Sequence, residues 1–240
     1  MLLSGVLMTA FVIIHFFSIH LKFEKIGLRR FISFSAGVGI AYVFIHLWPA
    51  VAHTQAIAEE HIQWLEGHVM HYALYMVALS GLVLVYVLDR LISKAYEDEE
   101  IRKPNVTESA LFWSHIAFFS LYNMMIGYLL TYRNVLNTSL LIFFVAFALH
   151  FITNDWGLRH HHEEAYDHYG RQILSISILI GYLIGHWSDF PEYFIGSVEA
   201  FVTGAMTLNV VKHELPSERE GNLEGFITGV LSASFLFILL

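Results

Sequence analysis

Long apolar runs bounded by polar clusters follow one another along the whole chain. The runs are 17–22 residues long and do not alternate with period two, which favours helices over strands. A helix needs about 20 apolar residues to cross the ~30 Å hydrocarbon core of a bilayer. The pattern therefore predicts eight transmembrane helices, near residues 2–20, 31–51, 70–90, 110–131, 137–157, 171–187, 194–212 and 222–240.

The composition agrees with this pattern. Of the 240 residues, 56% are apolar and 14% charged, and the mean hydropathy is +0.57. Soluble domains average about 45–50% apolar and about 25% charged residues. We therefore expect an all-α, polytopic membrane protein with one domain over residues 1–240 and a polar cytoplasmic linker over 91–109. The net charge of −8 offers no basic surface for a nucleic acid.

Basic residues are distributed unevenly among the loops. Of the 13 Lys and Arg, 12 follow spans one, three, five or seven, and only Arg133 falls in an even-numbered loop. Loops rich in Lys and Arg stay in the cytoplasm. The bias predicts that both termini lie on the non-cytoplasmic side of an integral, multi-pass protein.

Spans two and seven share a pattern at an offset of 167 residues. The matching pairs are Phe34 and Phe201, Gly37 and Gly204, Val43 and Val210, His46 and His213, and Pro49 and Pro216. Five spans separate the two, so they cross in opposite directions. An inverted repeat of this kind is typical of alternating-access transporters, whose binding site lies at the repeat interface near the middle of the membrane.

Candidate metal ligands lie inside the spans. The chain has no cysteine but 15 histidines, so a metal site needs imidazole, carboxylate or amide groups. His150 and Asn154 share one face of span five, and Asp155 follows one residue further round. Span four offers His115 and Asn123 at overlapping depths. These groups suit a borderline cation such as zinc.

Spans two and seven carry stripes of polar residues, which contain His46 on span two and Glu199 and His213 on span seven. We expect these stripes to line the entry and the exit of the metal site. A carboxylate at the centre of a membrane costs roughly 2.5–3.5 kcal/mol, so Glu199 should face a partner or a wet cavity. Two loop clusters also carry groups that hold labile cations: Glu59, Glu60, His61, Glu66, His68 and His71, and His160, His161, His162, Glu163, Glu164, Asp167 and His168.

Segments 34–37 (FSAG) and 46–49 (HLWP), and segments 201–206 (FVTGAM) and 214–218 (ELPSE), resemble helices two and seven of the ZIP (zinc and iron permease) family. Those family helices read F-x-A-G with H-L-x-P-E, and F-x-A-G-A-M with E-L-x-P-E. The resemblance covers most of the chain. It implies eight helices in a three-two-three inverted arrangement that carry zinc, iron or manganese into the cytoplasm without ATP, and it adds Glu214 to the candidate metal ligands.

The chain departs from this family where the metal chemistry is expected. Family helix four carries H-N-x-x-D/E-G, of which residues 122–127 keep Asn123 and Gly127. Family helix five carries H-E-x-P-x-E, of which residues 150–155 keep His150, with Asn154 at the fifth position and neither the Glu nor the Pro. A two-metal site of several carboxylates cannot be built from these positions.

Three functions remain open. The first is a secondary divalent-metal transporter, with the metal as substrate and no prosthetic group. The second is a ZIP-like membrane protein without transport, acting as a metal sensor or partner subunit. The third is an intramembrane metal-dependent hydrolase using His115, His150 and Asp155. An enzyme is not expected, because the chain has no H-E-x-x-H or G-x-S-x-G motif. The expected partners are a divalent cation and the lipid bilayer, with a homodimer as a candidate assembly.

Overall fold

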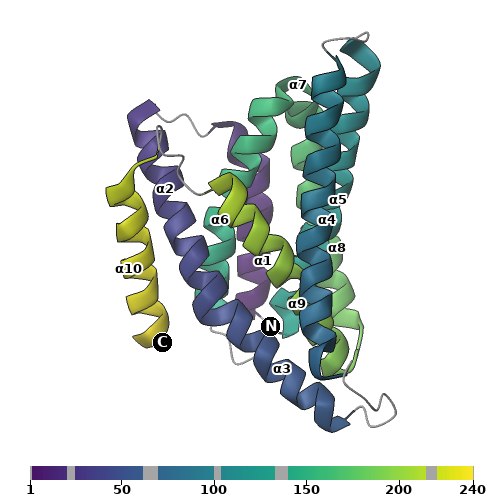
Figure 1. Ribbon diagram of the computed structural model, residues 1–240, viewed down its shortest axis with the longest axis vertical. Helices are drawn as coiled ribbons and strands as arrows, with labels where there is room; N and C mark the ends of the chain where they lie inside the picture. Colours follow the sequence, from purple (N-terminus) through teal and green to yellow (C-terminus); the bar gives the residue numbers. More distant parts are fainter. Residues whose placement is uncertain are drawn as a thin grey trace.

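The computed structural model is a helical bundle and describes residues 2–20, 25–61, 70–99, 104–132, 140–214 and 221–239 (Figure 1). Its eight helices are α1 (Leu2–Phe17) with η1 (Ser18–His20); α2 (Lys25–Tyr42) with η2 (Val43–Leu47) and α3 (Trp48–His61); η3 (Met70–Tyr72) with α4 (Ala73–Glu99); α5 (Pro104–Tyr132); α6 (Leu140–His161); α7 (Glu163–Ala165) with η4 (Tyr166–Gly170) and α8 (Arg171–Trp187); α9 (Glu192–Asn209) with η5 (Val210–Glu214); and α10 (Leu223–Leu239). Each predicted span overlaps one of them, and the described ranges contain no strand, which confirms the all-α prediction.

Four of these helices are long and apolar enough to cross a membrane. They are Gly27–Glu59, Ala73–Leu91, Leu140–His160 and Glu192–Lys212. Leu2–Phe17 and Leu223–Leu239 are also apolar but shorter. Large apolar side chains lie exposed on the outside of the bundle, for example Phe235 of α10 at 68%. An outer surface of this kind is suited to lipid.

The helix ends follow local sequence signals. Pro104 begins α5 at a position where its missing N–H is not needed. Pro191, in an extended conformation, precedes α9, whose first turn contains Glu192. The side chain of Asn222 caps α10 by accepting a hydrogen bond from the N–H of Gly225 at 2.6 Å.

The polar stretch 91–109, expected as a linker, is largely helical. α4 continues to Glu99 and α5 starts at Pro104, so the two helices extend beyond their neighbours at one end of the bundle (Figure 1). Lys94, Ala95, Glu97 and Glu99 are good helix formers, and they prolong α4 past its apolar run.

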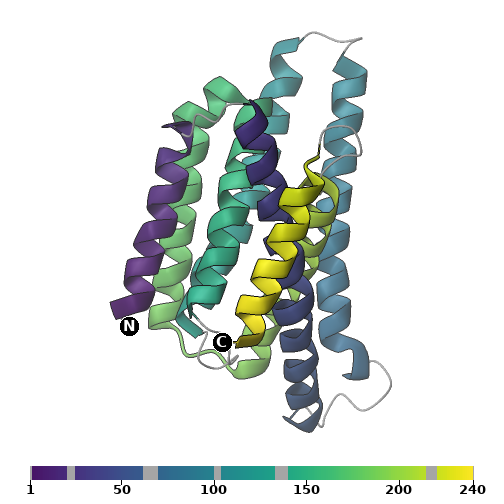
Figure 2. The ribbon, with the colours of Figure 1, turned by 90° about the vertical axis from the view of Figure 1, so that its left-hand side faces the viewer.

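Successive helices run up and down the bundle, and the N- and C-termini lie at the same end (Figures 1 and 2). The α2–α3 helix therefore runs opposite to α9. The number of described helices is even, so the first and the last of them have their outer ends at the same end of the bundle.

The helices pack in two groups of four. α1, α5, α6 and α8 contact one another through the pairs α5–α8, α1–α8 and α1–α6; we call them the α1 group. The α2–α3 helix, α4, α9 and α10 contact one another through α2–α10, α4–α9 and α3–α9; we call them the α2 group. Contacts between α2 and α6 and between α5 and α9 join the two groups.

Glycines bring the helices of the α2 group into close contact at two equivalent places. A Cβ atom at Gly37 would collide with the carbonyl oxygen of Phe226, and one at Gly204 would collide with that of Ala78. In the other direction, Gly229 lies against the carbonyl of Phe34, and Gly81 lies against that of Phe201. Phe34 and Gly37 are the residues that the 167-residue offset pairs with Phe201 and Gly204, so α2–α10 and α4–α9 pack through matching positions.

Both repeated helices also contain a π-helical turn at the same place. η2 covers Val43–Leu47 and η5 covers Val210–Glu214, again at the offset of 167 residues. In η2 the N–H of Trp48 bonds to the carbonyl of Val43, and Pro49 follows without an N–H of its own. The wider turn accommodates the proline ring without ending the helix, and π turns of this kind are frequent at functional sites.

Candidate functional site

His150 is the predicted ligand that lies most clearly between the two helix groups. Its side chain is 1% exposed, and Nε2 lies 3.5 Å from Nδ2 of Asn209 at the end of α9. On the α5 side, the rings of His150 and Tyr122 lie 5.9 Å apart, edge to face. His150 therefore contacts α5 of its own group and α9 of the other group. Asn209 was not among the predicted metal ligands.

Asn123 follows Tyr122 on α5 and is completely buried. Within the described part of the chain, neither its Oδ1 nor its Nδ2 has a hydrogen-bond partner. An unsatisfied buried amide costs about 1–3 kcal/mol, so native proteins keep such a group where water or a ligand satisfies it. His150 contacts Asn209 between the two groups, and Asn123 is buried one residue after Tyr122, which meets His150. We group these three residues, one imidazole and two amides, as the central polar site.

Asp155 lies elsewhere than expected. Both of its carboxylate oxygens lie 2.9 Å from Nδ1 of His15 in α1, and both side chains are fully buried. Asp155 comes five residues after His150, which places it about 140° further round the helix. The prediction that His150, Asn154 and Asp155 aim into one cavity is therefore wrong for Asp155, because its carboxylate pairs with α1.

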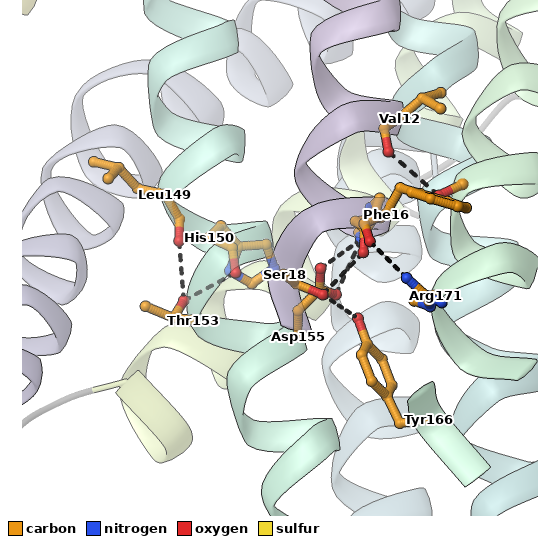
Figure 3. A network of polar contacts seen from close by, with 11 residues as sticks. Val12, Phe16, Ser18, Leu149, His150, Thr153, Asp155, Tyr166 and Arg171 are labelled. Atoms are coloured by element: carbon orange, nitrogen blue, oxygen red, sulfur yellow. Dashed lines mark hydrogen bonds and ion pairs between the residues drawn. The ribbon is translucent and has the colours of Figure 1, made fainter. Parts of the chain in front are cut away.

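The Asp155 pair belongs to a network that ties α1 to its neighbours. The hydroxyl of Ser18 donates to the carbonyl of His15 at 2.9 Å and lies 3.3 Å from the hydroxyl of Tyr166. Burial, with the nearby Asp155 carboxylate, raises the pKa of the Tyr166 hydroxyl, which stays neutral. Arg171 donates to the carbonyl of Phe16 at 3.1 Å. The network therefore holds α1 against its neighbours, which is a structural role (Figure 3).

His15 was not among the predicted site residues, although one signal in the sequence could have found it. It is an ionisable residue in the middle of the first apolar run, where such a residue needs a polar partner. Local spacing does not reveal which partner, because Asp155 lies 140 residues away.

Two other predicted residues each have one buried polar atom without a partner among the described residues. Oε2 of Glu199 in α9 and Nε2 of His46 in η2 have no hydrogen-bond partner among the described residues. Glu199 is 4% exposed, whereas the ring of His46 stacks on Tyr42 at 5.7 Å and meets Phe237 edge-on at 5.0 Å. Each helix thus has one buried polar atom of its predicted stripe without a partner, and an ion pathway along the stripes stays a prediction.

The remaining predicted ligands are dispersed. His115 pairs with His162, with Nδ1 and Nε2 3.1 Å apart. His115 therefore contacts the residue that directly follows α6, the helix of span five, and a metal site shared by His115 and this helix stays a prediction. Asn154 is partly exposed. His213 and Glu214 belong to η5, but their side chains lie outside the described residues.

In the ranges that the structure describes, no group of three or more His, Asp or Glu residues could hold a metal ion. The zinc site of the hydrolase alternative is not formed there, because His115, His150 and Asp155 contact His162, Asn209 and His15 respectively. A cation at the central polar site would instead meet one imidazole, amide oxygens and water, a weak and exchangeable ligand set.

Comparison with known proteins adds no relative: no family model, no curated protein and no solved structure matches the chain.

Proposed function

We propose that this protein is a ZIP-like secondary transporter that moves a divalent metal cation, zinc or else iron or manganese, toward the cytoplasm. The observation that carries the proposal is the buried contact between His150 and Asn209, which joins the two helix groups. A transported ion must bind where the moving parts meet, and weak ligands let it leave again. Asn123, buried without a partner among the described residues, supplies a further oxygen for an ion held there.

The repeat supports the same proposal. Matching glycine contacts and π turns relate α2 and α10 to α9 and α4, and α2 runs opposite to α9. We infer an inverted repeat and eight membrane crossings, with both termini on the non-cytoplasmic side, where the 12-to-1 charge bias puts them. In this arrangement the central polar site lies at the repeat interface.

A second candidate is a metal sensor or partner subunit of the same architecture without transport. The observation that favours it is that Asp155 is occupied by His15, which leaves the central polar site without a carboxylate. A site of three neutral groups attracts a divalent cation less than a carboxylate-rich one.

One experiment separates the two candidates. The pure protein is placed in liposomes, and entry of radioactive zinc, iron and manganese is measured per folded molecule. A transporter should take up at least one metal above protein-free liposomes, and His150→Ala should reduce that uptake at least tenfold. His186→Ala is the matched control, because His186 is an exposed histidine at the end of α8. No uptake of any metal by the wild type would favour the non-transporting candidate.

A further inference from the structure

Two histidines, His115 and His162, contact each other in the α1 group, away from the central polar site. Nδ1 of His115 in α5 and Nε2 of His162 lie 3.1 Å apart, although the residues are 47 positions apart in the sequence. His162 immediately precedes α7, which lies at the end of the bundle opposite the termini (Figure 1). The pair is remote from the central polar site, since His115 and Asn123 are about 12 Å apart along α5 at 1.5 Å per residue.

The facing nitrogen atoms have the spacing of metal ligands. Two imidazoles on a tetrahedral Zn²⁺, with Zn–N bonds of about 2.0–2.1 Å, hold their nitrogens about 3.3–3.4 Å apart. A shift of a few tenths of an ångström from 3.1 Å would admit the ion. The contact between two ring nitrogens also requires one of them to accept a hydrogen bond, so at least one ring presents the lone pair that a metal uses.

The backbone and the neighbouring side chains hold His162 in place. Its N–H donates to the carbonyl of Leu158 at 3.0 Å, and its carbonyl accepts from the N–H of Tyr166 at 2.8 Å. The ring of Phe112 packs edge-on against the His162 ring at 5.5 Å, and His162 is 4% exposed. A ligand held in this way loses little conformational entropy when a metal binds.

Close to His162 in the sequence, Arg159 of α6 pairs with Asp167 of η4. Arg159 donates two hydrogen bonds to the carboxylate of Asp167, at 2.7 and 2.9 Å, and this interaction raises the pKa of Arg159. Asp167 is therefore already bound and does not compete for a cation at the histidine pair. Water would supply further ligands to a cation held by the two imidazoles.

We propose that His115 and His162 form a second divalent-metal site, which links α5 to the junction of α6 and α7 through two imidazoles and water. The chemistry favours borderline ions such as Zn²⁺, Ni²⁺ and Cu²⁺ over Mg²⁺ or Ca²⁺. The site is independent of the proposed transport, because binding here requires no movement of ions across the membrane.

The test measures how many Zn²⁺ ions the full-length protein binds in detergent, by competition with a zinc-sensitive dye. His115→Gln and His162→Gln should each lose the same single ion, and the double variant should lose no more than either single variant. His186→Gln is the control, because His186 is an exposed histidine at the end of α8, and it should keep the full number. Full zinc binding by both single variants would overturn the proposal, and so would a loss of two ions in the double variant.

A second measurement keeps the test valid if a variant folds poorly. Metal bound by the wild type should raise its thermal midpoint, because an ion that joins α5 to the α6–α7 junction binds only the folded state. Zn²⁺ should produce this rise and Mg²⁺ should not. Equal rises with the two ions, or none with zinc, would overturn the proposal even without a usable variant.

Discussion

His15 and Asp155 form a fully buried pair in which both carboxylate oxygens lie 2.9 Å from the same imidazole nitrogen. The pair joins α1 to α6 within the α1 group. Removing one member of a buried, hydrogen-bonded pair leaves the other without compensation in a low-dielectric interior, at a cost of about 3–5 kcal/mol. We therefore expect Asp155→Ala to lower the amount of folded protein strongly, with metal uptake per folded molecule little changed.

A double-mutant cycle checks this role. His15→Ala should destabilise the protein about as much as Asp155→Ala, and the double variant should cost much less than the sum of the two, because they remove one interaction. Stability is measured by denaturant unfolding in detergent. Additive losses, or a well-folded Asp155→Ala variant that has lost metal uptake, would return Asp155 to the list of ion ligands.

The glycine contacts provide a test of the α4–α9 packing. A Cβ atom at Gly204 would collide with the carbonyl of Ala78, and backbone atoms cannot move aside as a flexible side chain can. Gly204→Ala should therefore destabilise the fold by about 1–3 kcal/mol. Gly157→Ala is the matched control: Gly157 also lies inside a helix, and a Cβ there would meet nothing within 4 Å. The control should be neutral or up to about 1 kcal/mol more stable, since alanine favours a helix.

The same measurement on Gly37→Ala tests the repeat. Gly37 in the α2–α10 contact is equivalent to Gly204 in the α4–α9 contact. The two substitutions should therefore lower the free energy of unfolding by similar amounts. A large loss at one site and none at the other would mean that the equivalent contacts are not energetically equivalent.

The helices could be predicted from the sequence because their signals are local. The apolar runs set the number of helices and their order, and both π turns lie within the segments that the 167-residue offset pairs. The length of α4 and α5 was underestimated, since hydropathy marks where a helix is apolar and not where it ends. Residues with high helix propensity extend α4 to Glu99.

The partners of the polar residues could not be predicted in the same way. Spacing on one helix says which residues share a face, as for His150 and Asn154, but not which helix lies opposite that face. Tertiary packing determines each partner: His15 is the partner of Asp155, Asn209 that of His150, and His162 that of His115. Most of these residues lie within the apolar runs of the sequence, where a polar side chain needs a partner.

Labelling of introduced cysteines tests the topology. The native chain has no cysteine, so a single cysteine is the only thiol. A cysteine at Asp189, between α8 and α9, should react with an impermeant reagent applied outside the cell. One at Arg159, near the opposite end of the bundle, should be protected until the membrane is opened. The reverse pattern would invert the orientation inferred from the charge bias.

If Asn123 binds the ion, one substitution there should have opposite effects on stability and on metal uptake. Both polar atoms of its amide are buried without partners in the described ranges, so the native state keeps an unfavourable group. If Asn123 contributes an oxygen to a transported ion, Asn123→Leu, which has a similar branched shape, should leave stability unchanged or raise it by about 1 kcal/mol. Uptake of the metal should fall at least tenfold, because leucine offers no ligand.

A structural asparagine would behave in the opposite way. If it hydrogen-bonds to water or to a group that holds the bundle together, Asn123→Leu should lower the free energy of unfolding, and uptake should fall only as folded protein is lost. Asn123→Asp separates the cases further, because a carboxylate retains an oxygen ligand and binds a divalent cation more strongly than an amide does. Slower release or tighter zinc binding by this variant would support an ion at the site, whereas unchanged binding and unchanged uptake in both variants would place the transport path elsewhere.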